Sequence, residues 1–188
     1  MIIRILLVLT CYIPCLLQAQ DPAAARLIEA QQIAMKKLDK MDGVWRGPAW
    51  TVLSNGEKHH LIQTERVGPF LVGSVKVVEG KGYESDGKSS FNAFGIISYD
   101  PARKAYSMRS YAMGRAGDYP LKITDTGYTW EMVFGPVTIR YTITIKDNEW
   151  KEIGERLQKD KDPVQIFEMT LNRVGDTSWP VEGTIPPK

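Results

Sequence analysis

The spacing of apolar residues along the chain changes once, near Gly43. Between Asp21 and Gly43 apolar side chains recur every three or four residues, as on one face of an α-helix. Asp21 and Pro22 form a strong helix start, because aspartate caps a first turn and proline fits the first helical position. The pattern predicts a helix over residues 22–41 that covers one end of the fold. Its predicted packing face carries Leu27, Ala30, Ala34, Leu38 and Met41.

Beyond Gly43, runs of β-branched and aromatic residues alternate with turn residues. Gly68-Pro69 and Asp100-Pro101 are two of the predicted breaks. The predicted strands cover residues 45–53, 60–67, 70–79, 90–99, 105–113, 119–124, 128–134, 137–146, 150–157 and 164–174. About ten short strands at regular spacing are typical of an all-β sandwich or barrel.

Alternation within three late strands assigns their faces. In residues 128–134, 137–145 and 165–173 every second side chain is apolar or aromatic, and those between are mostly hydrophilic. A closed antiparallel barrel of about 8–10 strands explains this pattern and leaves no exposed sheet edge. The pattern fits both an interior filled by side chains and one that holds a small ligand. The predicted inward-facing ligand contacts are Tyr128, Trp130, Met132, Tyr141, Phe167 and Met169.

The first 19 residues have the layout of a secretory signal peptide. Arg4 supplies a positive start, residues 5–17 are almost entirely apolar, and Ala19 is a small residue at the expected cleavage site. The apolar run is shorter than the roughly 20 residues of a membrane-spanning helix. Both cysteines, Cys11 and Cys15, lie in this segment, so the mature chain would have neither a disulfide nor a thiol nucleophile. We therefore predict an exported protein, located in a bacterial periplasm, with no transmembrane segment after cleavage.

Size and charge narrow the remaining organisation. Residues 20–188 suit one domain, with a helical segment at 20–43, a barrel at 44–174 and a flexible tail at 175–188 rich in proline and glycine. The 24 basic and 22 acidic residues give a formal charge of +2, which becomes +1 once Arg4 is removed. Such a balance does not favour a nucleic-acid partner, which usually requires a basic face.

One short motif suggests nucleotide binding but lacks the necessary context. Gly82, Gly87, Lys88 and Ser89 match the spacing of a phosphate-binding P-loop. A functional P-loop leads directly into a helix, whereas the residues after Ser89 read as a strand. We therefore predict a polar hairpin loop and no nucleotide.

The candidate chemical groups favour no single reaction. His59 and His60 are neighbours on a strand and would point to opposite faces, so we predict no metal or other cofactor. Glu131, Arg140 and Glu168 belong to the hydrophilic face and suit exterior ion pairs. Glu152 and Glu155 fall on opposite faces, so one of them is expected to point inward. No nucleophile-elbow motif is present, and we predict no catalytic residue.

Several segments resemble a family of bacterial lipocalin-like proteins of the calycin superfamily, a domain-of-unknown-function family. The matching stretches are "MDGVWRG", "FGIISYDPARKAY", "YTWEM", "RYTITI", "WKEIGE" and "FEMTLNR". The resemblance implies a β-barrel that binds a ligand. It also implies that Trp45 closes one end of the barrel and stacks against Arg173 of the last strand, a cation–π pairing.

These observations favour a protein that binds a small, largely apolar molecule inside its barrel. Two alternatives remain open. One is a barrel-shaped enzyme, an isomerase or hydrolase, that uses an inward Glu152 or Glu155 with Tyr99 or Tyr141. The other is a solid-cored barrel that acts through its surface on another protein.

Overall fold

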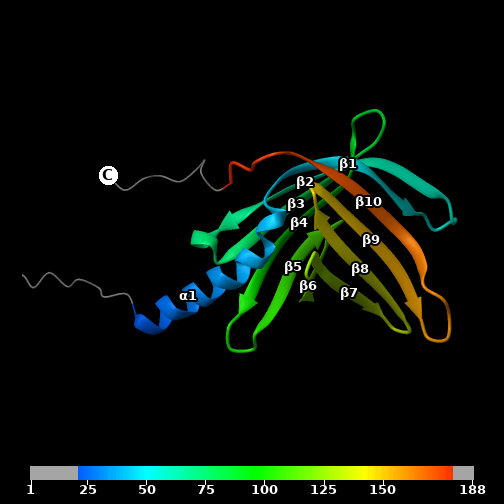
Figure 1. Ribbon diagram of the computed structural model, residues 1–188. Coiled ribbons are helices and arrows are strands. Elements are labelled where there is room, and N and C mark those ends of the chain that lie inside the picture. The colour runs from blue at the N-terminus through cyan, green and yellow to red at the C-terminus, as the bar shows by residue number, and fades with distance from the viewer. Residues whose placement is uncertain (1–20, 180–188) are drawn as a thin grey trace, which may run out of the picture.

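In the computed structural model, which describes residues 21–179, the first helix begins as its capping residues predict. Helix α1 (Pro22–Met35) follows Asp21, whose carboxylate accepts a hydrogen bond from the backbone N–H of Ala23 at 2.9 Å. A 3₁₀-helix, η1 (Lys36–Met41), continues it. The predicted packing face is correct only in its second half, because Leu27 is 52% exposed and Ala30 is half-buried. The reason is geometric: the last turn of α1 and η1 enter the barrel end, and the earlier turns project beyond it (Figure 1).

Ten strands follow, as the alternation of apolar runs and turns predicts. They are β1 (Gly43–Val52), β2 (Lys58–Phe70), β3 (Val75–Tyr83), β4 (Ser89–Asp100), β5 (Ala105–Ala112), β6 (Arg115–Ile123), β7 (Gly127–Phe134), β8 (Val137–Lys146), β9 (Glu149–Gln158) and β10 (Val164–Gly175). Each strand pairs antiparallel with its neighbours in sequence, and β10 returns to pair with β1. The predicted all-β antiparallel barrel with a helix at one end is therefore confirmed (Figure 1).

The predicted strands 60–67, 70–79 and 119–124 have wrong boundaries, and the second of them is β3, which runs from Val75 to Tyr83. Strand β2 runs through Gly68-Pro69, and Pro69 stays in register with Lys76 of β3. The extended backbone of proline fits near a strand end, where it removes only one ladder hydrogen bond. The turn comes later, at the short 3₁₀-helix η2 (Leu71–Gly73). Strand β6 also begins at Arg115 rather than at residue 119.

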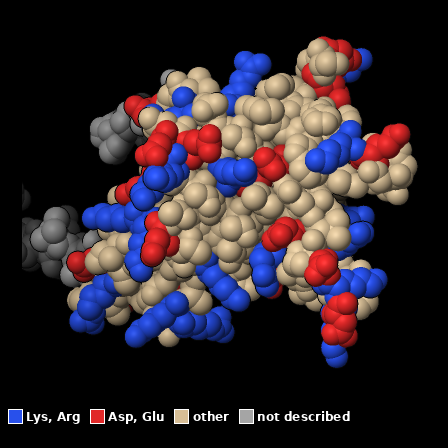
Figure 2. All heavy atoms as spheres, turned by 45° about the vertical axis from the view of Figure 1, so that its right-hand side comes forward, with Lys and Arg blue, Asp and Glu red and all other residues tan. Residues whose placement is uncertain are grey.

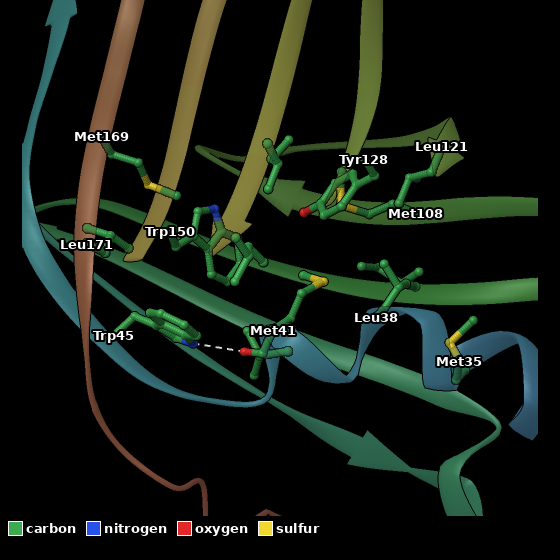
Figure 3. Close-up of a cluster of buried hydrophobic side chains, with 14 of the residues drawn as sticks. Met35, Leu38, Met41, Trp45, Met108, Leu121, Tyr128, Trp150, Met169 and Leu171 are labelled. Carbon is green, nitrogen blue, oxygen red and sulfur yellow. Dashed lines mark hydrogen bonds between the residues drawn. The ribbon is translucent and has the colours of Figure 1, made fainter. Parts of the chain in front are cut away.

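The end of the barrel beside α1 is closed by packed side chains (Figure 3). Leu38 and Met41 of η1 are buried against Trp45 and Trp150. The indole N–H of Trp45 donates to the carbonyl of Met41 at 2.8 Å, and the rings of Trp45 and Trp150 meet edge to face with centroids 5.8 Å apart. We refer to this as the closed end, and to the opposite end as the open end.

An ion pair with a buried lysine fixes η1 and the residue that follows it to the sheet. Lys76 on β3 is 1% exposed, and its ammonium lies 2.7 Å from the nearer oxygen of Asp42 and 3.0 Å from Asp39. Burial raises the pKa of Asp42, and the hydrogen bond and positive charge of Lys76 lower it. The closed end thus depends on a charged tether as well as on apolar packing.

Arg173 lies opposite Trp45 in the β1–β10 register. Its guanidinium donates to the carbonyl of Asp42 at 3.3 Å and to the carboxylate of Asp176. The arginine that lies over a tryptophan ring at this end is instead Arg66, 3.8 Å from the ring centroid of Trp179. Trp179 also packs on Phe70, so residues 176–179 of the predicted flexible tail lie against β2. The rest of that tail and the predicted signal peptide lie outside the described residues.

The segment with P-loop spacing is a hairpin loop. It joins β3 to β4, two antiparallel strands, and a strand rather than a helix follows it. Lys88 is 83% exposed and pairs with Asp86 at 2.7 Å. The structure confirms the predicted hairpin.

Candidate functional site

The interior of the barrel is packed at the closed end and accessible toward the open end. On β7, Tyr128 is buried, Trp130 and Met132 are half-buried, and Phe134 is exposed. On β6, Leu121 is likewise buried and Arg115 is exposed. Side chains on these inward faces thus become more accessible with distance from the packed closed end.

Four rings from β6, β7, β8 and β10 form one side of this accessible interior. We call this set, Tyr119, Trp130, Tyr141 and Phe167, the aromatic row. Trp130 and Tyr141 are stacked with centroids 4.4 Å apart and planes 10° from parallel, while Tyr119 and Phe167 continue the row at 5.1 and 5.9 Å. Gly154 makes room for it, because a Cβ there would lie 2.9 Å from both Tyr141 and Phe167. The row presents a large aromatic surface to the interior.

A group of polar side chains lies between the aromatic row and the closed end. We call this set, Gln63, Glu65, Tyr128 and Glu152, the polar cluster. Gln63 and Glu65 are 3% and 8% exposed, and the amide of Gln63 donates to the carboxylate of Glu65 at 2.7 Å. Gly80 leaves space for that carboxylate, since a Cβ there would lie 2.7 Å from it. Among the ion pairs of residues 21–179, neither Glu65 nor Glu152 has a cationic partner.

The environment of the polar cluster disfavours negative charge. Burial raises the pKa of Glu65 to about 7, although the hydrogen bond from Gln63 opposes this change. The pKa of Glu152 is raised to about 8, mainly by burial and also by the charge of Glu65, while the indole N–H of Trp130 opposes the rise. Burial and these carboxylates also raise the pKa of Tyr128 well above its usual value. Glu152 is nevertheless partly accessible. Because its position on β9 directs its side chain inward, this accessible surface faces the interior.

The structure resolves which of the two late glutamates points inward. Glu152 pairs with Ile143 and Met169, both of the buried core. Glu155 pairs with Arg140, whose guanidinium donates to Glu131 on the exterior at 2.7 Å. The predicted exterior ion pairs are thus present, and Glu152 is the inward carboxylate.

The six predicted ligand contacts lie on three strands, β7, β8 and β10. Tyr128 and Met169 belong to the buried core, while Trp130, Tyr141 and Phe167 pack against that core and are half-buried. Met132, in register with Ile139, lies nearer the open end. The structure brings these side chains into one interior, and their contact with a ligand stays a prediction.

Sequence reasoning missed Gln63 and Glu65. The signal was present, because Leu61, Gln63, Glu65 and Val67 alternate with more exposed residues in the same way as the late strands do. Because Gln63 and Glu65 on that face are polar, the segment did not show the alternation of apolar and polar residues that identified the faces of the late strands. The enzyme hypothesis also named Tyr99. This residue packs on Tyr106 near the closed end and lies away from Glu152. The hydroxyl of Tyr106 donates to the carbonyl of Ala34.

The mouth and the outer surface carry other features. His59 lies at the open end, 2.9 Å from the carboxylate of Glu84, whereas its neighbour His60 is exposed. A hollow of ≈ 560 Å³ beside the β5–β6 hairpin is lined by residues that include Ala93, Tyr111 and Met113.

Within residues 21–179 no three acidic, histidine or cysteine side chains gather as a metal site. Figure 2 shows acidic and basic side chains interspersed over the face it presents. No helix in the described part of the chain has the length and apolar character needed to cross a membrane.

Comparison with known proteins supports the fold class. Rv2717c from M. tuberculosis superposes with a TM-score of 0.56 and 11% identity, over 74% of this chain and 96% of that one. The S-type phycobiliprotein lyase CPES from Guillardia theta superposes with a TM-score of 0.52 and 7% identity, over 80% and 98%. No family model and no curated protein sequence matches the chain. The barrel and these neighbours therefore define the fold class as a closed ten-stranded antiparallel β-barrel with an N-terminal helix. The resemblance to a lipocalin-like bacterial family stays a prediction from its motifs.

Proposed function

We propose that this protein is an exported lipocalin-like carrier that binds a small, largely apolar molecule in its barrel. The observation that carries the proposal is the partly exposed aromatic row on the inward faces of a closed barrel. Pockets for small ligands are mostly apolar and aromatic, with a few polar groups that orient the ligand. The aromatic row and the polar cluster supply these two parts. The signal-peptide pattern of residues 1–19 supports an exported, periplasmic location.

Fluorescence tests the carrier function directly. The neutral apolar probe N-phenyl-1-naphthylamine should bind and quench tryptophan emission by energy transfer. Trp130→Phe should remove a large part of the quenching, because Trp130 belongs to the aromatic row. Trp50→Phe is the matched control, since Trp50 pairs with His60 and lies under the ammonium of Lys58 at 3.4 Å. Absence of saturable binding, together with mass spectra that show no small molecule co-purifying, would contradict the carrier function.

A second candidate function, general acid–base catalysis, is favoured by one observation. Glu152 is an inward carboxylate whose pKa, about 8, lies near neutrality, where proton transfer is most effective. Tyr141 lies one strand away, and burial raises the pKa of its hydroxyl to about 12. A lyase among the proteins of similar fold is consistent with this candidate. Turnover of a bound molecule that Glu152→Gln abolishes without loss of binding would establish the enzyme over the carrier.

A further inference from the structure

The polar cluster is unusual for the interior of a barrel that binds a purely apolar molecule. Glu65 and Glu152 come from strands on different sides of the closure, β2 and β9, and their charges influence each other and Tyr128. Buried carboxyl groups are costly unless they are hydrogen-bonded or paired. Within residues 21–179 the only hydrogen bond to the Glu65 carboxylate is the one from Gln63. The cluster therefore has acceptor oxygens available to a donor inside the barrel.

An independent observation on the neighbouring side chain also indicates a polar occupant. Trp150, the inward residue two places before Glu152, is 1% exposed, and its indole N–H has no hydrogen-bond partner in the described structure. Figure 3 shows this nitrogen on the edge of Trp150 away from Trp45, with the hydroxyl of Tyr128 directed toward Trp150. Buried donors without a partner are rare in folded proteins and call for an explanation. A polar group in the space beside Tyr128 and Glu152 would supply one.

The aromatic row sets the shape of the rest of the occupant. Trp130 and Tyr141 are stacked nearly parallel, and a flat ring system packs well against the aromatic row. Tyr141 of the row is in register with Gly154, two residues along β9 from Glu152, which places the row beside the polar cluster. A cationic nitrogen gains from charge-assisted hydrogen bonds to carboxylates. A carboxylate-bearing ligand would instead meet two acidic groups and no described cation.

We propose that the barrel selects a flat aromatic molecule with a basic nitrogen, its ring against the aromatic row and its nitrogen at Glu65 and Glu152. This inference rests on the carrier function proposed above and narrows it to one class of ligand. The nitrogen donates to the carboxylates, and an acceptor atom on the same ligand would take the N–H of Trp150. Glu152 is the better residue to test, because it faces the accessible part of the interior.

Three probes that share one ring system separate charge from shape: 2-naphthylmethylamine, 2-methylnaphthalene and 2-naphthoate. Titration calorimetry at pH 7.5 should show the amine binding at least about tenfold more tightly than the neutral hydrocarbon, and the carboxylate most weakly. Glu152→Gln should remove the preference for the amine and leave binding of 2-methylnaphthalene unchanged. Glu155→Gln removes the same charge from the outer face of the same strand and should change neither.

The outcomes distinguish this inference from the function on which it rests. Equal binding of the amine and the hydrocarbon would overturn the inference and leave the carrier function intact, with water satisfying the polar cluster. Binding of no probe would overturn both. An amine preference that Glu155→Gln also removes would place the amine on the outer surface and overturn the inference. If Glu152→Gln does not fold, Glu65→Gln provides the same comparison from the opposite strand.

Discussion

At the residue scale, Trp45 and Trp150 offer a measurement of one buried hydrogen bond. Both are 1% exposed, and their rings contact each other at the closed end. The N–H of Trp45 donates to Met41, whereas that of Trp150 has no described partner. Replacement of either tryptophan by phenylalanine removes similar apolar volume, but only Trp45→Phe leaves a buried carbonyl without its donor.

We therefore expect Trp45→Phe to lower the free energy of unfolding by about 1 kcal/mol more than Trp150→Phe. Urea titrations of both variants, followed by circular dichroism, measure the difference. Equal losses would show that the hydrogen bond from Trp45 to Met41 contributes nothing net to the closed end.

The two inward glutamates predict an unusual dependence of stability on pH. The pKa of each is raised in the folded protein, to about 7 for Glu65 and about 8 for Glu152, from an ordinary value of 4.5. Between pH 4.5 and 8 the folded protein holds protons that the unfolded chain releases, so stability falls as pH rises through this range. The fall is steepest where both carboxyl groups are still protonated in the folded protein and already ionised in the unfolded chain.

Glu152→Gln should make the melting temperature depend less on pH between 5 and 8. Glu155→Gln controls for the loss of one negative charge on β9 and should keep the pH dependence of the natural protein. Differential scanning calorimetry across this range is the measurement. An equal pH dependence in Glu152→Gln and in the natural protein would show that Glu152 is not held in a charge-disfavouring site.

At the element scale, the ion pair of the buried Lys76 controls whether η1 stays in the barrel end. Lys76→Met removes the cation and leaves Asp42, already destabilised by burial, without its main partner. We expect a loss of about 2–4 kcal/mol and faster cleavage by trypsin at Lys36, Lys37 or Lys40 of η1. Lys81→Met is the matched control on the same strand, because Lys81 pairs with Glu79 on a partly exposed face. Unchanged cleavage in Lys76→Met would mean that apolar packing alone holds η1.

The hairpin between β3 and β4 carries the P-loop spacing, and a substitution in it tests whether this segment binds a nucleotide. Lys88→Ala should change the free energy of unfolding by less than about 0.5 kcal/mol, since the Lys88–Asp86 pair is solvent-exposed. Probe binding should also be unchanged. Magnesium-dependent nucleotide binding that disappears with Lys88→Ala would contradict the assignment of this segment as a plain hairpin.

Local sequence patterns predicted the strand faces well where the burial of apolar residues alone decided which side chains point inward. The faces of β7, β8 and β10 followed from alternation, because polar residues there are almost confined to the outside. The inward face of β2 did not follow in this way, because Gln63 and Glu65 face inward against the usual preference of charged groups for water. The break at Gly68-Pro69 was wrong because strand pairing outweighed two turn-forming residues. The exposure of Leu27 depends on how far α1 projects from the barrel, which no local pattern encodes.

At the scale of the whole molecule, the export that we propose and the folding of the barrel would use separate parts of the chain. The proposed signal peptide ends at Ala19, and the first described contact, the cap of α1 by Asp21, begins two residues later. Cleavage before Gln20 would therefore keep every described element, and the mature barrel would contain no cysteine. Folding in an oxidising compartment would then depend on the core and the Lys76 tether alone.

The last prediction tests this separation in a bacterial host. The periplasmic fraction should contain a protein whose N-terminal sequence begins at Gln20. Ala19→Phe should block processing, because signal cleavage requires a small residue at that position. Ala24→Phe adds the same side chain on an exposed turn of α1 and should leave processing and the barrel unchanged. A natural protein that is recovered from the cytoplasm and still begins at Met1 would refute export, whereas the carrier function inside the barrel would remain open to the probe experiments.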